Sequence, residues 1–153
     1  MLDACEELDI AVIALMPLLQ GILTGKYRPR GPALPSRVKI VMRVMQLDLF
    51  RESHERPSLL RRLFSKPYPM RREALEPLFE VMANLAKQHN ATIAQVALNW
   101  LLGINDRVLP IVGAKNLRQA QDNARTLSWQ LSQGEMDLIS ATEATIRKQA
   151  LGS

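Results

Sequence analysis

Residues 110–123 read PIVGAKNLRQAQDN: a short apolar run, a glycine turn and a polar segment. Asn116, with Gln119 three residues later, is typical of a helix N-terminus. The first turn of a helix leaves backbone N–H groups unpaired, and the helix dipole adds partial positive charge. Lys115 supplies a full charge beside it. The stretch therefore predicts a strand, a turn and a helix that binds a phosphorylated ligand, with an ordinary turn and cap as the alternative.

Two segments carry strand patterns. Residues 10–15 form a continuous apolar run, which is typical of a strand buried on both faces. A second strand is predicted at residues 107–112, directly before the glycine turn. Leu2, Cys5 and Leu8 fit the end of a helix that leads into the first strand.

Further helices are predicted between and after these strands. Apolar side chains repeat at helical spacing over residues 75–86. Two S/T-x-x-E/Q patterns form capping boxes, a proline falls in a first turn, and a glycine is expected to end a helix. The residues concerned are Pro77, Thr92 with Gln95, Gly103, and Ser132 with Glu135. The alternation of strands and helices indicates βαβ units and a parallel sheet.

Two blocks of sequence, in the same order, resemble the aldo-keto reductase family. Residues 113–116 read GAKN and resemble the segment with which the family holds the 2′-phosphate and adenine of NADP(H). Residues 17–27 read PLLQGILTGKY and are similar to the family's SPL-x-QG-x-LTGKY loop, with Ser36 and Arg37 downstream. Residues 94–101 and 127–132 also resemble family segments. The resemblance covers nearly the whole chain apart from about residues 38–70.

The resemblance implies roles in cofactor binding for residues after the second strand. Lys115 would pair with the 2′-phosphate beside the backbone of Gly113. Gln119 and Asn123 would hydrogen-bond the adenine side, and Asp122 would accept a hydrogen bond from the adenine amine or the ribose. Solvated helix side chains are the alternative for Asp122 and Asn123.

The loop after the first strand would hold the other end of the cofactor. Its backbone would face the pyrophosphate, with two cationic side chains as clamps or, alternatively, as ordinary surface charges. These residues are Pro17, Leu18, Leu19, Gln20, Lys26 and Arg37.

The resemblance implies an α/β fold, a (β/α)8 TIM barrel. A closed barrel of this kind has eight strands and about 250 residues, whereas 153 residues here supply two predicted strands. We therefore expect an incomplete barrel, equivalent to the last two βα units plus the C-terminal helices of the family, with residues 28–72 as an excursion within this single domain.

Catalysis in the family depends on a Tyr, Lys, Asp and His that lie in its N-terminal part. No counterpart is found here, so no catalytic residue is assigned. Tyr27 and Tyr68 lack the neighbours that would lower a phenol pKa from about 10 towards working pH, and we expect both to be structural. Leu15 and Met16 also stand where the family usually has an aromatic residue followed by Ser, and Val112 stands where Pro is common.

Charge is concentrated in residues 28–72. Twelve Lys or Arg face three acidic residues there, a local net charge of +9, whereas the rest of the chain sums to −4. Nucleic acid is disfavoured as the ligand because the segment has only three aromatic side chains for base stacking. An exposed excursion that attracts an anionic cofactor is the preferred interpretation.

Other classes of function find little support in the sequence. No apolar run approaches the roughly 20 residues of a membrane helix. Cys5 is alone and cannot form an internal disulfide, and a small buried thiol is the expected role. His54 and His89 have no Cys, Asp or Glu at ligand spacing, so no metal site is expected.

Three hypotheses follow. The first is a C-terminal part of an NADP(H)-dependent oxidoreductase of the aldo-keto reductase type, acting on a small carbonyl substrate only if the missing half is supplied. The second is a non-catalytic NADP(H)-binding or regulatory module, and the third is a basic interaction protein. Association with an N-terminal half or with further copies is left open. The expected compartment is the cytoplasm, with an organelle such as a plastid as the alternative.

Overall fold

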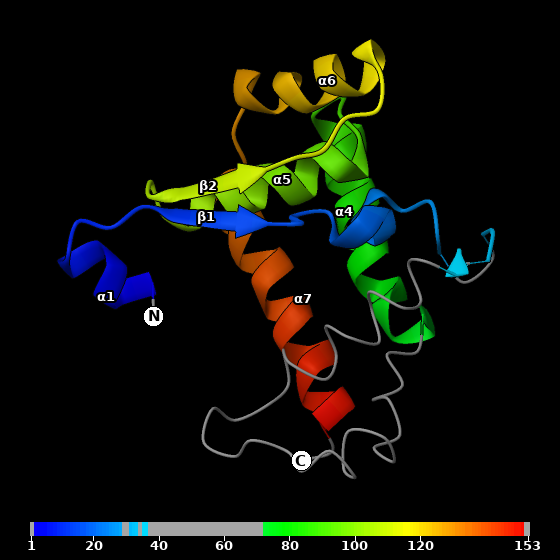
Figure 1. Ribbon diagram of the computed structural model, residues 1–153. Coiled ribbons are helices and arrows are strands. Elements are labelled where there is room, and N and C mark those ends of the chain that lie inside the picture. Colours follow the sequence, from blue (N-terminus) through cyan, green and yellow to red (C-terminus); the bar gives the residue numbers. More distant parts are fainter. Residues whose placement is uncertain (1, 29–30, 34, 37–71, 152–153) are drawn as a thin grey trace, which may run out of the picture.

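The computed structural model describes residues 2–28, 31–33, 35–36 and 72–151 (Figure 1). Arg37, Tyr68 and most of the basic segment therefore lie outside the described residues. No helix in the described part is long and apolar enough to cross a membrane. The elements are α1 (Leu2–Glu7), β1 (Val12–Leu15), the 3₁₀ helices η1 (Leu19–Thr24) and η2 (Arg72–Leu75), α4 (Glu76–Gln88), α5 (Ile93–Ile104), β2 (Val108–Ile111), α6 (Leu117–Ala124), the 3₁₀ helix η3 (Arg125–Ser128) and α7 (Gln133–Leu151).

The hydrophobic core lies between α4, α5 and α7. Phe79 and Met82 on α4 and Val96 on α5 are almost completely buried, and Ile139 of α7 packs against them. The apolar positions predicted on α4 are the ones that this core uses, because they recur at the spacing that places them on one helix face. Figure 1 shows α4 and α7 descending from the level of the sheet, with α5 behind the strands.

The predicted helix caps are present. Thr92 and Gln95 form a reciprocal capping box at the start of α5. Ser132 and Glu135 do the same at the start of α7. The prediction that Gly103 ends α5 is wrong, because the helix continues through Ile104. The absent side chain of this glycine has a packing role instead: a Cβ there would lie 2.9 Å from the Met136 methyl carbon on α7.

The two strands form one parallel sheet in the described residues. The register pairs Val12 with Val108 and Leu15 with Ile111. α5 covers one face of this sheet, against which Val108 is buried.

The expectation that the first strand is buried on both faces is wrong. Ile13 and Leu15 on β1 and Leu109 and Ile111 on β2 are 52–71% exposed. These four side chains form what we call the open face of the sheet. They are exposed because strand residues alternate between faces, and no described element covers the face opposite α5.

α1 lies at the periphery, beside the start of β1 (Figure 1). This helix, described throughout, buries no side chain, and Cys5 is half-buried rather than fully buried as expected. Polar contacts connect α1 and the turn that follows it to the segment before β2. Arg107 forms an ion pair with Asp9, and the Asn105 side-chain amide donates to a Glu6 carboxylate oxygen at 2.9 Å.

Candidate cofactor-binding site

Most of the described candidate residues lie on two loops that leave the same edge of the sheet, and Gln119, Asp122 and Asn123 lie on the helix α6 that follows the second loop. β1 and β2 are parallel neighbours, and their last residues, Leu15 and Ile111, are paired. The loop after β1 (residues 16–27) and the loop after β2 (residues 112–116) therefore begin side by side, as Figure 1 shows. Ligands of open α/β sheets bind at this carboxyl edge of the strands.

The loop after β2 is held by side chains of the helix that it enters. The Asn116 side chain accepts from the backbone N–H of Gln119 at 2.9 Å and so caps α6, as predicted. The Gln119 side-chain oxygen accepts from the backbone N–H of Lys115 at 2.8 Å. The Asn123 amide lies 3.5 Å from the carbonyl oxygen of Gly113. Gln119 and Asn123 thus shape the turn as well as being candidate adenine contacts.

The surface of this loop is open. Gly113 and Lys115 are exposed, and a Cβ built on Gly113 would meet no atom within 4 Å. Among the described residues the Lys115 ammonium forms no ion pair, whereas the Asp122 carboxylate lies 3.9 Å from Arg118 one turn away. Such an exposed pair contributes little to stability. A cation, a helix N-terminus and room for a ligand therefore coincide here.

The loop after β1 has an unusual backbone. Met16, Leu19 and Gln20 all have positive φ angles between 47° and 56°. Non-glycine residues seldom adopt this region, and such conformations concentrate at functional sites. Two features favour glycine at position 25. Its φ angle is 75°, and a Cβ there would lie 2.7 Å from a methyl group of Ile93. The loop is thus fixed in a costly shape that packing against α5 supports.

The side chains of this loop divide between core and solvent. Leu18, Leu19 and Tyr27 pack against the core, as does the half-buried Leu23. Lys26 is exposed, and its ammonium lies 5.6 Å from the centre of the Tyr27 ring. The remaining members of the predicted set are Pro17, which is half-buried, and Gln20, which is exposed.

The two positions that depart from the family pattern lie where β1 ends. Leu15 is 71% exposed on the open face, and Met16 is half-buried. The Gln20 side-chain amide donates to the Met16 sulfur at 2.9 Å. An aliphatic side chain and a thioether therefore occupy this end of the site, which offers neither an aromatic face nor a hydroxyl.

Sequence reasoning missed two buried amides on α5. Gln95 is 4% exposed and Asn99 is 5% exposed, although both are polar. Their side chains bind backbone groups of the segment that follows the candidate loop. The available signal was their spacing of four residues on an otherwise apolar helix, which places both on one side.

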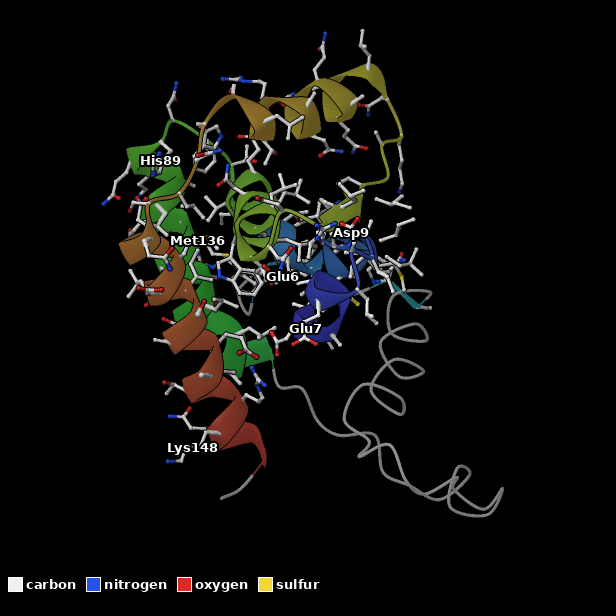
Figure 2. All side chains as sticks on the ribbon, turned by 90° about the vertical axis from the view of Figure 1, so that its left-hand side faces the viewer. Glu6, Glu7, Asp9, His89, Met136 and Lys148 are labelled. Carbon is white, nitrogen blue, oxygen red and sulfur yellow. The ribbon has the colours of Figure 1, made fainter. Side chains whose placement is uncertain are left out.

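The sequence patterns also did not predict a cluster of His89, Glu135 and Trp129 that joins α4 to α7. The His89 ring nitrogen lies 2.7 Å from a Glu135 carboxylate oxygen, and the ring stacks on Trp129 with centroids 4.6 Å apart. Figure 2 shows His89 at the end of α4, near the start of α7. Hydrogen bonds from the Ser132 backbone N–H and from His89 lower the pKa of Glu135. The described residues contain no group of three potential metal ligands.

The chain has parallel strands with adjacent loops at one carboxyl edge, and one loop leads into a capped helix beside a lysine. Ligands of open α/β sheets, including phosphates, commonly bind at such an edge. The chain belongs to the aldo/keto reductase family, because the sequence model of that family matches residues 1–144. This finding confirms the resemblance seen in the sequence. It also identifies the chain's relatives as oxidoreductases.

Three relatives illustrate the match. Pyridoxal reductase, chloroplastic, of Arabidopsis thaliana is 32% identical over 135 residues, which cover 86% of this chain and 28% of the relative. L-glyceraldehyde 3-phosphate reductase of Escherichia coli (strain K12) is 31% identical over 129 residues, which cover 84% of this chain and 32% of the relative. Aldo-keto reductase yakc [NADP(+)] of Schizosaccharomyces pombe is 28% identical, covering 99% and 38%. The chain thus spans about a third of the length of these relatives.

Family membership implies a (β/α)8 barrel architecture. The described α/β arrangement is consistent with part of such a barrel, since it has two parallel strands with α5 on one face. In a barrel the face opposite the helices is the interior. The open face, defined by Ile13, Leu15, Leu109 and Ile111, is likewise the face opposite α5.

Proposed function

We propose that this chain binds NADP(H) through the two loops at the carboxyl edge of β1 and β2, as the cofactor-binding part of an aldo-keto reductase. The parallel pairing of Leu15 with Ile111 carries the proposal, because it brings two loops from distant parts of the sequence together. NADP(+) is also the cofactor in the printed name of the Schizosaccharomyces pombe relative.

The loop after β2 is the proposed binding element for the 2′-phosphate. Lys115 is exposed beside the N-terminus of α6, and the space above Gly113 is open. The positive helix end and the ammonium both favour a phosphate at this position. Asp122 and Asn123, which lie farther along α6, would contact the adenosine.

The loop after β1 is the proposed element for the pyrophosphate. Its residues 17–20 would present backbone groups, and Lys26 would add charge. The positive φ angles of Leu19 and Gln20 show that this backbone is held in a specialised shape. Arg37 would be a second cation, although it lies outside the described residues.

Reduction of a carbonyl would need groups that this chain does not supply. When bound, NADPH provides a hydride, but a proton donor must also reach the carbonyl oxygen. Tyr27 packs against the core and has no assigned role in proton transfer. We therefore propose that the family's catalytic Tyr, Lys, Asp and His, and the pocket for a small carbonyl substrate, come from polypeptide outside this sequence.

The open face is where we propose that such polypeptide packs. Two parallel strands with unpaired outer edges in the described residues do not form an independently stable sheet. The chain covers about a third of each relative, and this supports the proposal that the occupant is the remaining strands of the same barrel. A second copy of this chain is the competing occupant.

A non-catalytic NADP(H)-binding module is the second candidate. It is favoured by Leu15 and Met16, which leave the nicotinamide end without the aromatic residue and serine usual in the family. The adenine end, by contrast, keeps Gly113, Lys115, Gln119, Asp122 and Asn123 of the family pattern and departs from it only at Val112, where Pro is common.

Titration with NADPH tests the proposal. We expect NADPH to bind more tightly than NADH, and Lys115→Ala to weaken NADPH binding at least about tenfold, since a charge-assisted hydrogen bond contributes roughly 1.5–3 kcal/mol. Lys148→Ala is the matched control, because Lys148 lies near the far end of α7, away from α6 (Figure 2). The proposal would be refuted if the wild-type chain bound NADPH and NADH with equal affinity and Lys115→Ala bound NADPH as tightly as the wild type.

A carbonyl-reduction assay separates the two candidates. The chain alone should bind cofactor without turnover under either. Turnover after addition of a polypeptide that carries the other barrel strands and the catalytic residues would favour the reductase. Binding that persists without turnover in that mixture would favour the non-catalytic module. Tight, salt-sensitive binding of RNA in place of NADPH would instead support the basic interaction protein.

A further inference from the structure

α6 carries three of the proposed cofactor residues but has no hydrophobic anchor of its own. The structure describes this helix throughout, and none of its side chains is buried. Leu117, in its first turn, is 73% exposed. Because amphipathic helices are normally held by a buried apolar face, something else must fix the position of α6.

Two buried amides on α5 make the connection. The Gln95 side-chain amide donates to the carbonyl oxygen of Asp122 at 2.6 Å. The Asn99 amide donates to the carbonyl oxygens of Thr126 at 3.1 Å and Trp129 at 2.7 Å. The Asn99 oxygen accepts from the backbone N–H of Leu131 at 2.9 Å. The two side chains thus bind the chain from the end of α6 to the start of α7.

The same connection continues to the candidate phosphate loop. Gln119 and Asn123 of α6 hold the backbone of Lys115 and Gly113, as described above. Hydrogen bonds therefore run from the interior of α5 through α6 to the backbone beside Lys115. A buried amide without a hydrogen-bond partner costs free energy. Movement of α6 away from α5 would leave the Gln95 amide unpaired, and this cost stabilises the observed position of α6.

We infer that Gln95 and Asn99 are positioning residues: Gln95 holds the end of α6, and Asn99 holds the segment that follows it, so that the Gly113–Lys115 turn keeps the geometry that binds the 2′-phosphate. The inference rests on the proposed function for its ligand. It adds that the affinity for NADPH depends on two buried residues of α5 that are not among the proposed cofactor contacts. A solely structural role would change overall stability without changing the preference for NADPH over NADH.

Variants can separate the link to α6 from the helix cap. Gln95→Glu keeps an acceptor for the Thr92 N–H but removes the donor to Asp122. Because it also places a charge in a buried position, Gln95→Met is the second variant, with neither donor nor charge. Thr92→Ala is the control, since it weakens the same cap and does not contact α6.

Hydrogen exchange on the full chain without cofactor tests the positioning directly. We expect both Gln95 variants to speed amide exchange in residues 117–124 about tenfold relative to α4, and Thr92→Ala to leave that ratio unchanged. Asn99→Asp, which keeps the acceptor for Leu131, should speed exchange in residues 125–129. Unchanged exchange of α6 in both Gln95 variants would overturn the inference.

NADPH titration of the same variants tests the consequence. Dissociation constants for NADPH should rise roughly threefold to tenfold in the Gln95 variants, with a smaller NADPH-to-NADH preference, and should stay unchanged in Thr92→Ala. If α6 loosens and NADPH affinity is unaffected, the positioning role is wrong. If the wild-type chain does not bind NADPH at all, the proposed function fails, and the exchange experiment still decides whether the amides fix α6.

Discussion

The helical core and the two-stranded sheet are built from equally apolar residues, yet they end in opposite environments. Phe79, Val96 and Leu98 in the helices are at most 2% exposed. Ile13 and Leu109 on the open face are 63% and 52% exposed. The helices bury one another's apolar side chains, because each has a single apolar stripe that needs one partner. A parallel strand buries its side chains only when it has neighbouring strands at both edges and a layer of structure on each face.

The difference indicates that the helical core and the sheet have separate roles. The core of α4, α5 and α7 supplies stability from residues of the chain itself. The sheet supplies position, by aligning two loops at one edge. We therefore expect stability and ligand binding to respond to different substitutions.

The largest effect should come from the core. Phe79→Ala should lower the free energy of unfolding by about 3–5 kcal/mol, because it leaves a cavity in close-packed surroundings. Leu109→Ala, on the open face, should cost well under half as much, since that side chain is 52% exposed. Urea unfolding followed by circular dichroism measures both. Equal losses would mean that the open face is covered in solution.

The open face should govern self-association. The double substitution Ile13→Thr with Leu109→Thr replaces exposed apolar groups by a residue that strands accept. We expect at least a severalfold weaker tendency to associate in sedimentation velocity, with the circular dichroism spectrum retained. Leu138→Thr on α7, where the side chain is 49% exposed, is a control of the same chemistry elsewhere. An unchanged sedimentation profile for the double variant would argue against an interaction surface at this face.

Helix caps distinguish global from local stability. Thr92→Ala should lower the free energy of unfolding by about 1 kcal/mol, because α5 lies in the core. Asn116→Ala removes a cap of the same kind from α6, which buries none of its described side chains. Its effect should appear as faster hydrogen exchange within α6, with little change in the urea midpoint. A fall in that midpoint equal to the one caused by Thr92→Ala would show that α6 belongs to the core.

The smallest effect concerns pH. The pKa of Glu135 is lowered in the folded chain, chiefly by the Ser132 N–H and then by His89. Its contribution to stability is therefore complete above the unfolded value of about 4.3 and is lost as the pH falls through the lower folded pKa. Unfolding of Glu135→Gln should lack this acid-side decline. An identical pH profile for both proteins below pH 4.3 would contradict the assignment.

Sequence patterns predicted the core better than the sheet. Helical spacing over residues 75–86 identified the buried side chains of α4 because a helix carries its apolar stripe in its own sequence. The capping patterns at Thr92 and Ser132 were confirmed for the same local reason. The apolar run at residues 10–15 gave the strand but not its environment, since burial of a strand depends on distant elements.

The candidate site was predicted unevenly. The motifs identified the two loops and the Asn116 cap, and the family was confirmed. The contribution of Gln95 and Asn99 was missed because hydrogen bonds to backbone carbonyls about thirty residues away leave no local signal. The cofactor roles of the loop residues stay predictions, as does the role of the basic segment at 28–72.

The most direct test of the central claim maps NADP+ onto the backbone. Amide resonances of the chain would be followed by NMR during titration with NADP+ and, separately, with NAD+. We expect shifts in both loops, residues 16–27 and 112–116, with the largest response at Lys115 and Asn116, and a weak response to NAD+. Shifts confined to one loop, or equal responses to both cofactors, would contradict a single 2′-phosphate-dependent site at the carboxyl edge of β1 and β2.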